Sequence, residues 1–239
     1  MMTPKHVAAG WVAIVFTVAC GGTSALSYDQ SRTGAQIIDD GSNALRSLHS
    51  AHVTIQSTYQ GSASVFEADI ENQNIKGTIT LGTAGKLNMI VDAGNLYIYG
   101  PDLLAFSHVT DQTVIAKVGE KWIIMPPGLI VDQQGLEALS NFSGMADCMK
   151  SGSAYTKKGT SVIAGQSVVE VQDTAGSQVF VQLSGPHYPI QVVIVPSECS
   201  AAGQPQAGTF DLTRIGDHFG ITPPANSTDL ASVGLSTGA

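Results

Sequence analysis

The stretch Ile75–Tyr99, IKGTITLGTAGKLNMIVDAGNLYIY, decides the fold. It divides into three short runs of β-forming residues, Ile75–Leu81, Lys86–Val91 and Leu96–Tyr99, separated by turns that contain Gly and Asn. Because Gly and Asn readily adopt the positive φ angles of hairpin connections, the spacing predicts an antiparallel meander. Apolar and polar residues alternate within it, so each strand has one apolar face. An amphipathic sheet must bury that face against another layer or against a ligand.

The composition excludes some partners. The 239 residues carry a net charge of -8 and only 13% charged residues, against 43% hydrophobic ones. The single basic cluster is the pair Lys157-Lys158. Phosphate-tracking surfaces need concentrated positive charge, so no nucleic-acid partner is expected.

The first twenty residues have the pattern of an export signal. Lys5 is followed by the apolar run Val7–Ala19, which is too short to span about 30 Å of hydrocarbon. The end of this run, Thr17-Val18-Ala19-Cys20-Gly21, resembles the bacterial lipobox, which makes Cys20 the expected acylated N-terminus. An ordinary secretory signal that contains a Cys is the alternative. Residues 1–19 are therefore predicted to be a signal peptide, and residues 20–32 an acylated flexible tether.

Residues 33–224 are predicted to form one β-rich domain. Thr33 and Gln36 have the spacing of a capping box, and apolar residues at helical spacing follow, which predicts a helix over residues 34–50. Two short helices are predicted within residues 128–151, and residues 225–239 are predicted to be disordered. Further strands are predicted at residues 53–59, 64–70, 114–118, 121–125, 160–164, 167–172, 178–183, 191–195 and 209–215.

Three cysteines are an odd number for an exported chain until Cys20 is assigned to acylation. Cys148 and Cys199 then remain as an even pair, for which a disulfide is favoured in an oxidising compartment. Two free buried thiols or a metal pair are the alternatives.

No catalytic or metal site stands out. His49 and His52 have the i, i+3 spacing of a shared metal site, but nothing supplies a third ligand. Asp211 and Asp217 are the two carboxylates that could act together as acid and base, yet isolated Asp residues at strand ends usually stabilise turns. The chain has no nucleophile elbow and no glycine-rich phosphate loop. We expect no cofactor, no metal and no enzymatic activity.

At the scale of the whole chain, the order of elements resembles the mycobacterial LppX/LprG-type lipoproteins (LppX, LprA, LprF and LprG) and, more distantly, the LolA/LolB carriers. The resemblance rests on Cys20, the helix before the first strand, Gly94–Ile98 followed by Lys121-Trp122, and the helical excursion after Pro126-Pro127. It implies an α+β, β-rich fold: a strongly curved antiparallel half-barrel with helices covering its concave face. In several members of that family the enclosed cavity takes acyl chains.

The resemblance also implies a function. An acylated lipid or glycolipid would be the ligand, bound for transport or retention by a protein anchored through Cys20 to the outer face of the plasma membrane. An envelope transport protein is a possible further partner, and residues 128–151 would form a lid. Alternation alone does not distinguish a cavity from a filled core, so a scaffold lipoprotein with a solid core is the alternative. An envelope hydrolase of an unfamiliar kind is the second alternative. The residues expected to line the cavity are Ile79, Leu81, Met89, Val91, Leu96, Ile98, Trp122, Ile124, Val181 and Val192.

Overall fold

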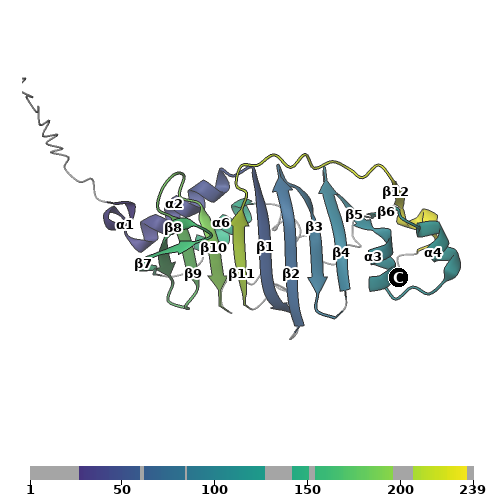
Figure 1. Cartoon of the computed structure of the whole chain (residues 1–239), viewed down its shortest axis with the longest axis horizontal. Coiled ribbons are helices and arrows are strands. Elements are labelled where there is room, and N and C mark those ends of the chain that lie inside the picture. The colour runs from purple at the N-terminus through teal and green to yellow at the C-terminus, as the bar shows by residue number, and fades with distance from the viewer. Residues whose placement is uncertain are drawn as a thin grey trace, which may run out of the picture.

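A computed structural model of the chain describes residues 27–59, 62–83, 85–126, 142–150, 154–195 and 207–235. These residues form one open sheet of twelve strands, in the order β12-β6-β5-β4-β3-β2-β1-β11-β10-β9-β8-β7 (Figure 1). All neighbouring strands are antiparallel except β12 and β6, which are parallel. The predicted half-barrel is confirmed as a large antiparallel sheet that does not close.

The strands of the first half follow each other along the chain. They are β1 (Ser50–Tyr59), β2 (Ser62–Glu71), β3 (Asn74–Leu81), β4 (Gly85–Asp92), β5 (Asn95–Tyr99) and β6 (Trp122–Met125). The second half contains β7 (Thr156–Ile163), β8 (Gln166–Gln172), β9 (Gln178–Gln182), β10 (Pro189–Ile194) and β11 (Gly208–Thr213), and the short β12 (Ser227–Asp229) lies beside β6.

Pairing between β1 and β11 joins the two halves into one sheet. Val53 of β1 lies opposite Leu212 of β11 on one side and opposite Ala68 of β2 on the other. All three side chains are buried in the main core. A shift of one residue would turn each strand's apolar residues to the opposite face, so the burial of these residues sets the register.

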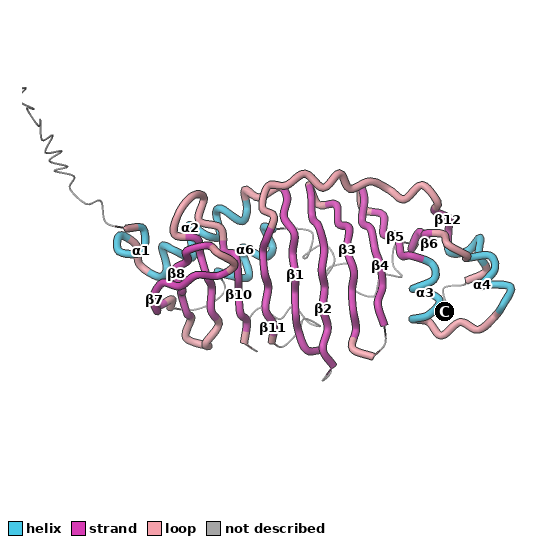
Figure 2. Tube along the Cα trace, in the orientation of Figure 1, coloured by secondary structure: helices cyan, strands magenta, loops and turns pink. Residues whose placement is uncertain are grey.

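Three helices lie at the β7 end of the sheet: α1 (Tyr28–Ser31), α2 (Gly34–Arg46) and α6 (Phe142–Lys150) (Figure 2). The predicted capping box is present, because the Thr33 side chain accepts from the Gln36 N–H and the Gln36 side chain accepts from the Thr33 N–H. Ion pairs Lys150–Asp39, at 2.6 Å, and Arg46–Asp147 connect α6 to α2. Helix α2 packs over β7 to β10, and we call the face that it covers the concave face.

The segment that includes α1 differs from its predicted role as part of a flexible tether. The Tyr28 ring stacks on His187, with 3.7 Å between ring centroids, and its hydroxyl donates to Asp40 at 3.0 Å. Burial of the ring and the nearby Asp40 carboxylate raise the pKa of Tyr28 above its usual value. An aromatic ring near the end of a polar segment is enough to dock it onto the folded domain.

At the other end of the sheet, the predicted strand 114–118 is wrong. Residues Gln112–Val118 form helix α4, and residues Gly100–Phe106, directly after β5, form helix α3. Asp111 caps α4, because its carboxylate accepts from the Thr113 N–H at 2.8 Å. Proline suits the first turn of a helix, and the β-branched residues of α4 pack on a second small core.

The predicted disordered tail is also corrected in part. Residues Ser227–Asp229 form β12, and Leu230–Val233 form the short 3₁₀ helix η1. Leu230 and Val233 are buried against Leu104, Val118 and Ile123. A Ser/Thr/Gly/Ala-rich composition indicates low average burial, but two apolar side chains suffice to attach this segment to the edge of the sheet.

A strap, defined here as residues 214–226, connects β11 to β12 and passes across the ends of the strands between them (Figure 1). Glu71 at the end of β2 holds it. Its carboxylate accepts from the N–H groups of Phe219 and Gly220, at 3.3 and 2.9 Å, and contacts the His218 ring at 2.5 Å. The contact with His218, and then the backbone donors, lower the pKa of Glu71.

The lowered pKa predicts that acid releases the strap. A carboxyl group with a lowered folded-state pKa stabilises the fold above its unfolded pKa of about 4.3, and that contribution is lost as pH falls through the folded-state pKa. In an NMR titration below about pH 4.3, we expect the amide signals of Phe219 and Gly220 to shift together. Glu71→Gln should abolish this step, whereas Glu67→Gln, on the same strand, should leave it intact. A step that persists in Glu71→Gln would contradict the assignment.

Candidate functional site: the concave apolar face

The concave face carries aliphatic side chains across most of the sheet. Ladder pairs place Ile75 opposite Val91, Val91 opposite Leu96, and Met89 opposite Ile98. These residues belong to, or pack against, the same apolar cluster as Val181 and Val192 in the other half of the sheet. They share one face because successive side chains of a β-strand point to opposite sides of the sheet, and these residues occupy alternate positions.

The helices cover the two halves of this face differently. Helix α2 lies over β7 to β10, where the sheet residues beneath it, such as Val181, are fully buried. On β3 to β5, Ile79, Val91 and Ile98 lie on the same face but are only partly buried. Helix α3 lies beside β4 and β5 near their ends. The β3–β5 half of the face is thus the part with apolar surface in reach of a ligand.

Seven of the ten residues predicted to line a cavity lie together on this face. Met89, Leu96, Val181 and Val192 are buried in the main cluster, and Ile79, Val91 and Ile98 pack against it. Leu81, at the end of β3, is partly buried. The sheet brings these residues together although more than a hundred positions separate Ile79 from Val192, because β1 pairs with β11.

Trp122 and Ile124 lie on the opposite face of the sheet. Trp122 is paired with Tyr99, and Ile124 with Tyr97, in the β5–β6 ladder. Both pack against a separate cluster that contains Ile90, Tyr97 and Ile221. The structure therefore does not bring them together with the other predicted residues. The side chains of β6 that do face the main core and the second core are Ile123 and Met125.

The cluster also includes residues that the candidate list omits. Phe66, Ala68 and Ile70 of β2 and Phe210 of β11 are buried there. The alternation Phe66-x-Ala68-x-Ile70 is visible in the sequence, and it is the signal by which the three β2 residues could have been predicted to line this face. Which of two alternating sets faces inward is not visible, because both sets can contain apolar residues.

The acylation of Cys20 and the disulfide between Cys148 and Cys199 stay predictions. Cys20 and Cys199 lie outside the described residues, as do residues 128–141 and 151 of the expected lid. Within that stretch, α6 is the described element, and Phe142, Ala146 and Met149 pack into the main core.

The residues weighed for metal binding or hydrolysis are in separate places. His52 lies in β1 with Nδ1 at 2.8 Å from Asp69 and Nε2 at 3.7 Å from Glu67, whereas His49 is exposed at the end of the α2–β1 connection. Asp211 accepts from Gln191, and Asp217 pairs with Arg214. No cluster of three or more metal-ligating side chains occurs within the described ranges. Among those same residues, none of the helices has the length and apolar character of a membrane span.

The sequence matches no protein-family model and no curated protein. Two solved structures share its architecture. LprF from Mycobacterium bovis superposes with a TM-score of 0.57 at 16% sequence identity, over 80% of this chain and 97% of LprF. The lipoprotein LppX from Mycobacterium tuberculosis superposes with a TM-score of 0.52 at 12% identity, over 79% of this chain and 97% of LppX. The resemblance drawn from the sequence is thus confirmed at the level of the fold: this chain has the architecture of the mycobacterial lipoproteins LprF and LppX.

Proposed function

We propose that this protein is a cell-envelope lipoprotein that binds a lipid or a lipidated molecule on its concave face, for transport or retention in the envelope. The observation that carries the proposal is the aliphatic face of β3 to β5. Ile79, Val91 and Ile98 continue the apolar surface of the main core but stay partly exposed. Apolar surface of this kind, continuous with a core, is typical of ligand-binding concavities.

The energetics favour an acyl chain as the occupant. Each buried methylene contributes about 0.8 kcal/mol, so one long acyl chain gives on the order of 10 kcal/mol before the costs of ordering and association. The face offers aliphatic side chains without charges, because Lys76, Thr78 and Asn88 alternate to the other side of the sheet. Such a surface recognises chain length and shape, with no chemical transformation of the ligand.

The anchor completes the proposal. Acylation of Cys20 would attach the domain to the outer face of the plasma membrane, and diacylation gives stable attachment where a single chain does not. Both the LppX fold and the lipobox-like sequence around Cys20 support this arrangement.

The test is native mass spectrometry of residues 21–239 exported from a bacterial host, before and after extraction with organic solvent. We expect a defined lipid mass that is lost on extraction. Ile79→Trp should reduce the retained lipid severalfold, because the indole would fill space on the half-covered face. Val181 is a poorer position for this test, since it is fully buried under α2 and a Trp there would disturb folding.

Thr80→Trp is the matched control. Thr80 is the next residue of the same strand and is also partly buried, but it points to the opposite face. The Thr80→Trp substitution should therefore leave lipid retention unchanged. A lipid-free mass, even after incubation with phospholipid, would overturn the carrier proposal and leave the scaffold alternative. Equal loss in both variants would show that the lipid does not occupy the concave face.

A further inference from the structure

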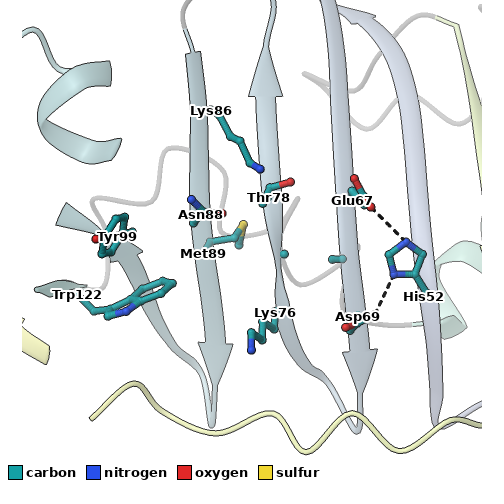
Figure 3. Close-up of a pocket in the computed structure, with 12 residues that line it drawn as sticks. His52, Glu67, Asp69, Lys76, Thr78, Lys86, Asn88, Met89, Tyr99 and Trp122 are labelled. Carbon is teal, nitrogen blue, oxygen red and sulfur yellow. Dashed lines mark hydrogen bonds and ion pairs between the residues drawn. The ribbon is translucent and has the colours of Figure 1, made fainter. Parts of the chain in front are cut away.

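The outer face of the sheet carries a groove of about 480 Å³ over β1 to β6 (Figure 3). This volume falls within the range of about 300–1,000 Å³ that is common for small-molecule sites. Outward-facing side chains form its walls, and Ala68, Gly77 and Met89, which lie between them along the strands, complete its floor. The wall residues are His52, Glu67, Asp69, Lys76, Thr78, Lys86, Asn88, Tyr99 and Trp122.

The strand register arranges the walls in rows. Glu67 lies opposite Thr78, Thr78 opposite Asn88, and Tyr99 opposite Trp122, so a polar row leads to a pair of aromatic rings. His52, Asp69 and Lys76 form a parallel row beside it. Figure 3 shows the aromatic pair at one end and the His52 cluster at the other, with the two lysines on opposite flanks.

The carboxylates of the groove already have partners. Asp69 lies 2.8 Å from His52 Nδ1 and 3.6 Å from Arg214 Nη1, and Glu67 lies 3.7 Å from His52 Nε2. A cationic ligand would have to compete with these partners.

The two lysines of the groove lack such partners within the described ranges. Lys76 and Lys86 form neither an ion pair nor a side-chain hydrogen bond with any described residue. Lys76 lies opposite Ile90 and Lys86 opposite Thr80, so four residue steps, or about 13 Å, separate them along the strands. Their flexible side chains can both reach the middle of the groove, next to Thr78 and Asn88. Two ammonium groups beside the polar side chains of Thr78 and Asn88 favour an anionic group there.

The aromatic end offers a surface for a ring. The Tyr99 and Trp122 ring centroids lie 5.5 Å apart at an interplanar angle of 53°. Trp122 also packs against the cluster of Ile90, Tyr97 and Ile221, which fixes its position at the edge of the groove. Side chains of this kind combine an apolar face with a polar edge, and they suit ligands that have both apolar and hydroxylated faces.

Between the two ends, Asn88 is held in place from the side. Asp102 at the start of α3 accepts from both the backbone N–H and the side-chain Nδ2 of Asn88, at 2.8 and 2.6 Å. The amide is therefore oriented so that its Oδ1, which no described residue donates to, can accept from a ligand hydroxyl. Thr78 beside it both donates and accepts. These are the groups that polyhydroxylated ligands need.

We propose that this outer groove binds an anionic sugar, meaning a sugar ring that carries a phosphate or carboxylate group. The ring lies against Trp122 and Tyr99, its hydroxyls bond to Asn88 and Thr78, and its anionic group lies between Lys76 and Lys86. The same chemistry occurs in free sugar phosphates and in glycolipid headgroups. The groove lies on the opposite side of the sheet from the concave face, so this proposal does not depend on lipid binding to the concave face.

Fluorescence offers a direct test, because the chain contains only two tryptophans, Trp11 and Trp122. In the full chain with Trp11→Phe, Trp122 is the only tryptophan whether or not the N-terminal segment is cleaved. Glucose 6-phosphate and glucuronic acid should change its emission saturably, and neutral glucose should bind at least tenfold more weakly. Lys76→Met and Lys86→Met should each weaken the binding of glucose 6-phosphate by about tenfold, the usual effect of a lost charge-assisted hydrogen bond. Lys158→Met removes the same charge from exposed β7 at the far edge of the sheet and should have no effect.

Two arms distinguish the sources of the sugar. Full-length protein is placed in nanodiscs of phosphatidylcholine alone or of phosphatidylcholine with phosphatidylinositol. Soluble glucose 6-phosphate is then added to the nanodiscs that contain phosphatidylcholine alone. A lysine-dependent response to the free sugar supports a soluble ligand, and one confined to phosphatidylinositol supports a lipid headgroup. Equal affinity for inorganic phosphate and glucose 6-phosphate would overturn the sugar site. So would the absence of any response, or a response that both lysine variants retain.

Discussion

Replacing Leu45 by Ala is expected to lower the free energy of unfolding by about 2–5 kcal/mol, the usual cost of truncating a large buried side chain. Leu45 is fully buried in the last full turn of α2 and belongs to the cluster that joins α2 and α6 to the sheet. The substitution keeps helix propensity but removes apolar contacts and leaves a cavity. Urea unfolding followed by circular dichroism measures the change.

Asn43→Ala is the control for this prediction. Asn43 lies two residues earlier on the exposed side of the same helix, where its side chain accepts from Arg46 at 3.4 Å. Its replacement should change the free energy of unfolding by no more than about 0.5 kcal/mol. Comparable losses for both variants would contradict the prediction, because they would show that the loss at Leu45 does not come from its burial against the sheet.

Two glycine-to-alanine substitutions should have opposite signs. Gly77→Ala is expected to destabilise the protein by about 1–3 kcal/mol or more, because a Cβ at Gly77 would lie 2.4 Å from both the Ala68 Cβ and the Glu67 carbonyl oxygen. Strands β2 and β3 approach closely there, and neither backbone can give way without disturbing the ladder. Gly41→Ala, in the interior of α2, should raise stability by up to about 1 kcal/mol.

The opposite effects expected for Gly77→Ala and Gly41→Ala have a geometric cause. At Gly41, a Cβ would meet the Val181 Cγ2 at 3.4 Å and the Met149 Cε at 3.7 Å, which are ordinary contact distances. Thermal unfolding of both variants under the same conditions measures the contrast. A neutral Gly77→Ala would mean that β2 and β3 separate readily. A strongly destabilising Gly41→Ala would mean that α2 lies closer to β9 than these distances state.

The meander was predicted closely from the sequence. The predicted runs Ile75–Leu81, Lys86–Val91 and Leu96–Tyr99 correspond to β3, β4 and β5, each with its bounds within one residue. Alternation and turn chemistry are local properties, and local pairing between consecutive strands follows from them. The capping box of α2 was predicted correctly for the same reason, since it too is a local pattern.

Local patterns failed where tertiary contacts decided the outcome. Val114, Ile115 and Val118 have high β-propensity, yet they form α4 because Asp111 caps the helix and its apolar side packs on η1. The composition of the C-terminal segment predicted disorder, but Leu230 and Val233 bind it to the same small core. Propensity is a weak preference that burial of a few large side chains overrides.

For the candidate sites, the sequence by itself determined the set of apolar strand residues, the meander that holds them, and the lipobox-like segment around Cys20. The tertiary structure alone decided which face each residue joins. It placed Ile79 and Ile98 on the concave side and Trp122 on the outer side, where Trp122 lines the same groove as Lys76, Lys86 and Asn88. The reason is physical: alternation specifies that a strand has two faces, but only its register with distant strands and the packing of α2 specify which face is inside.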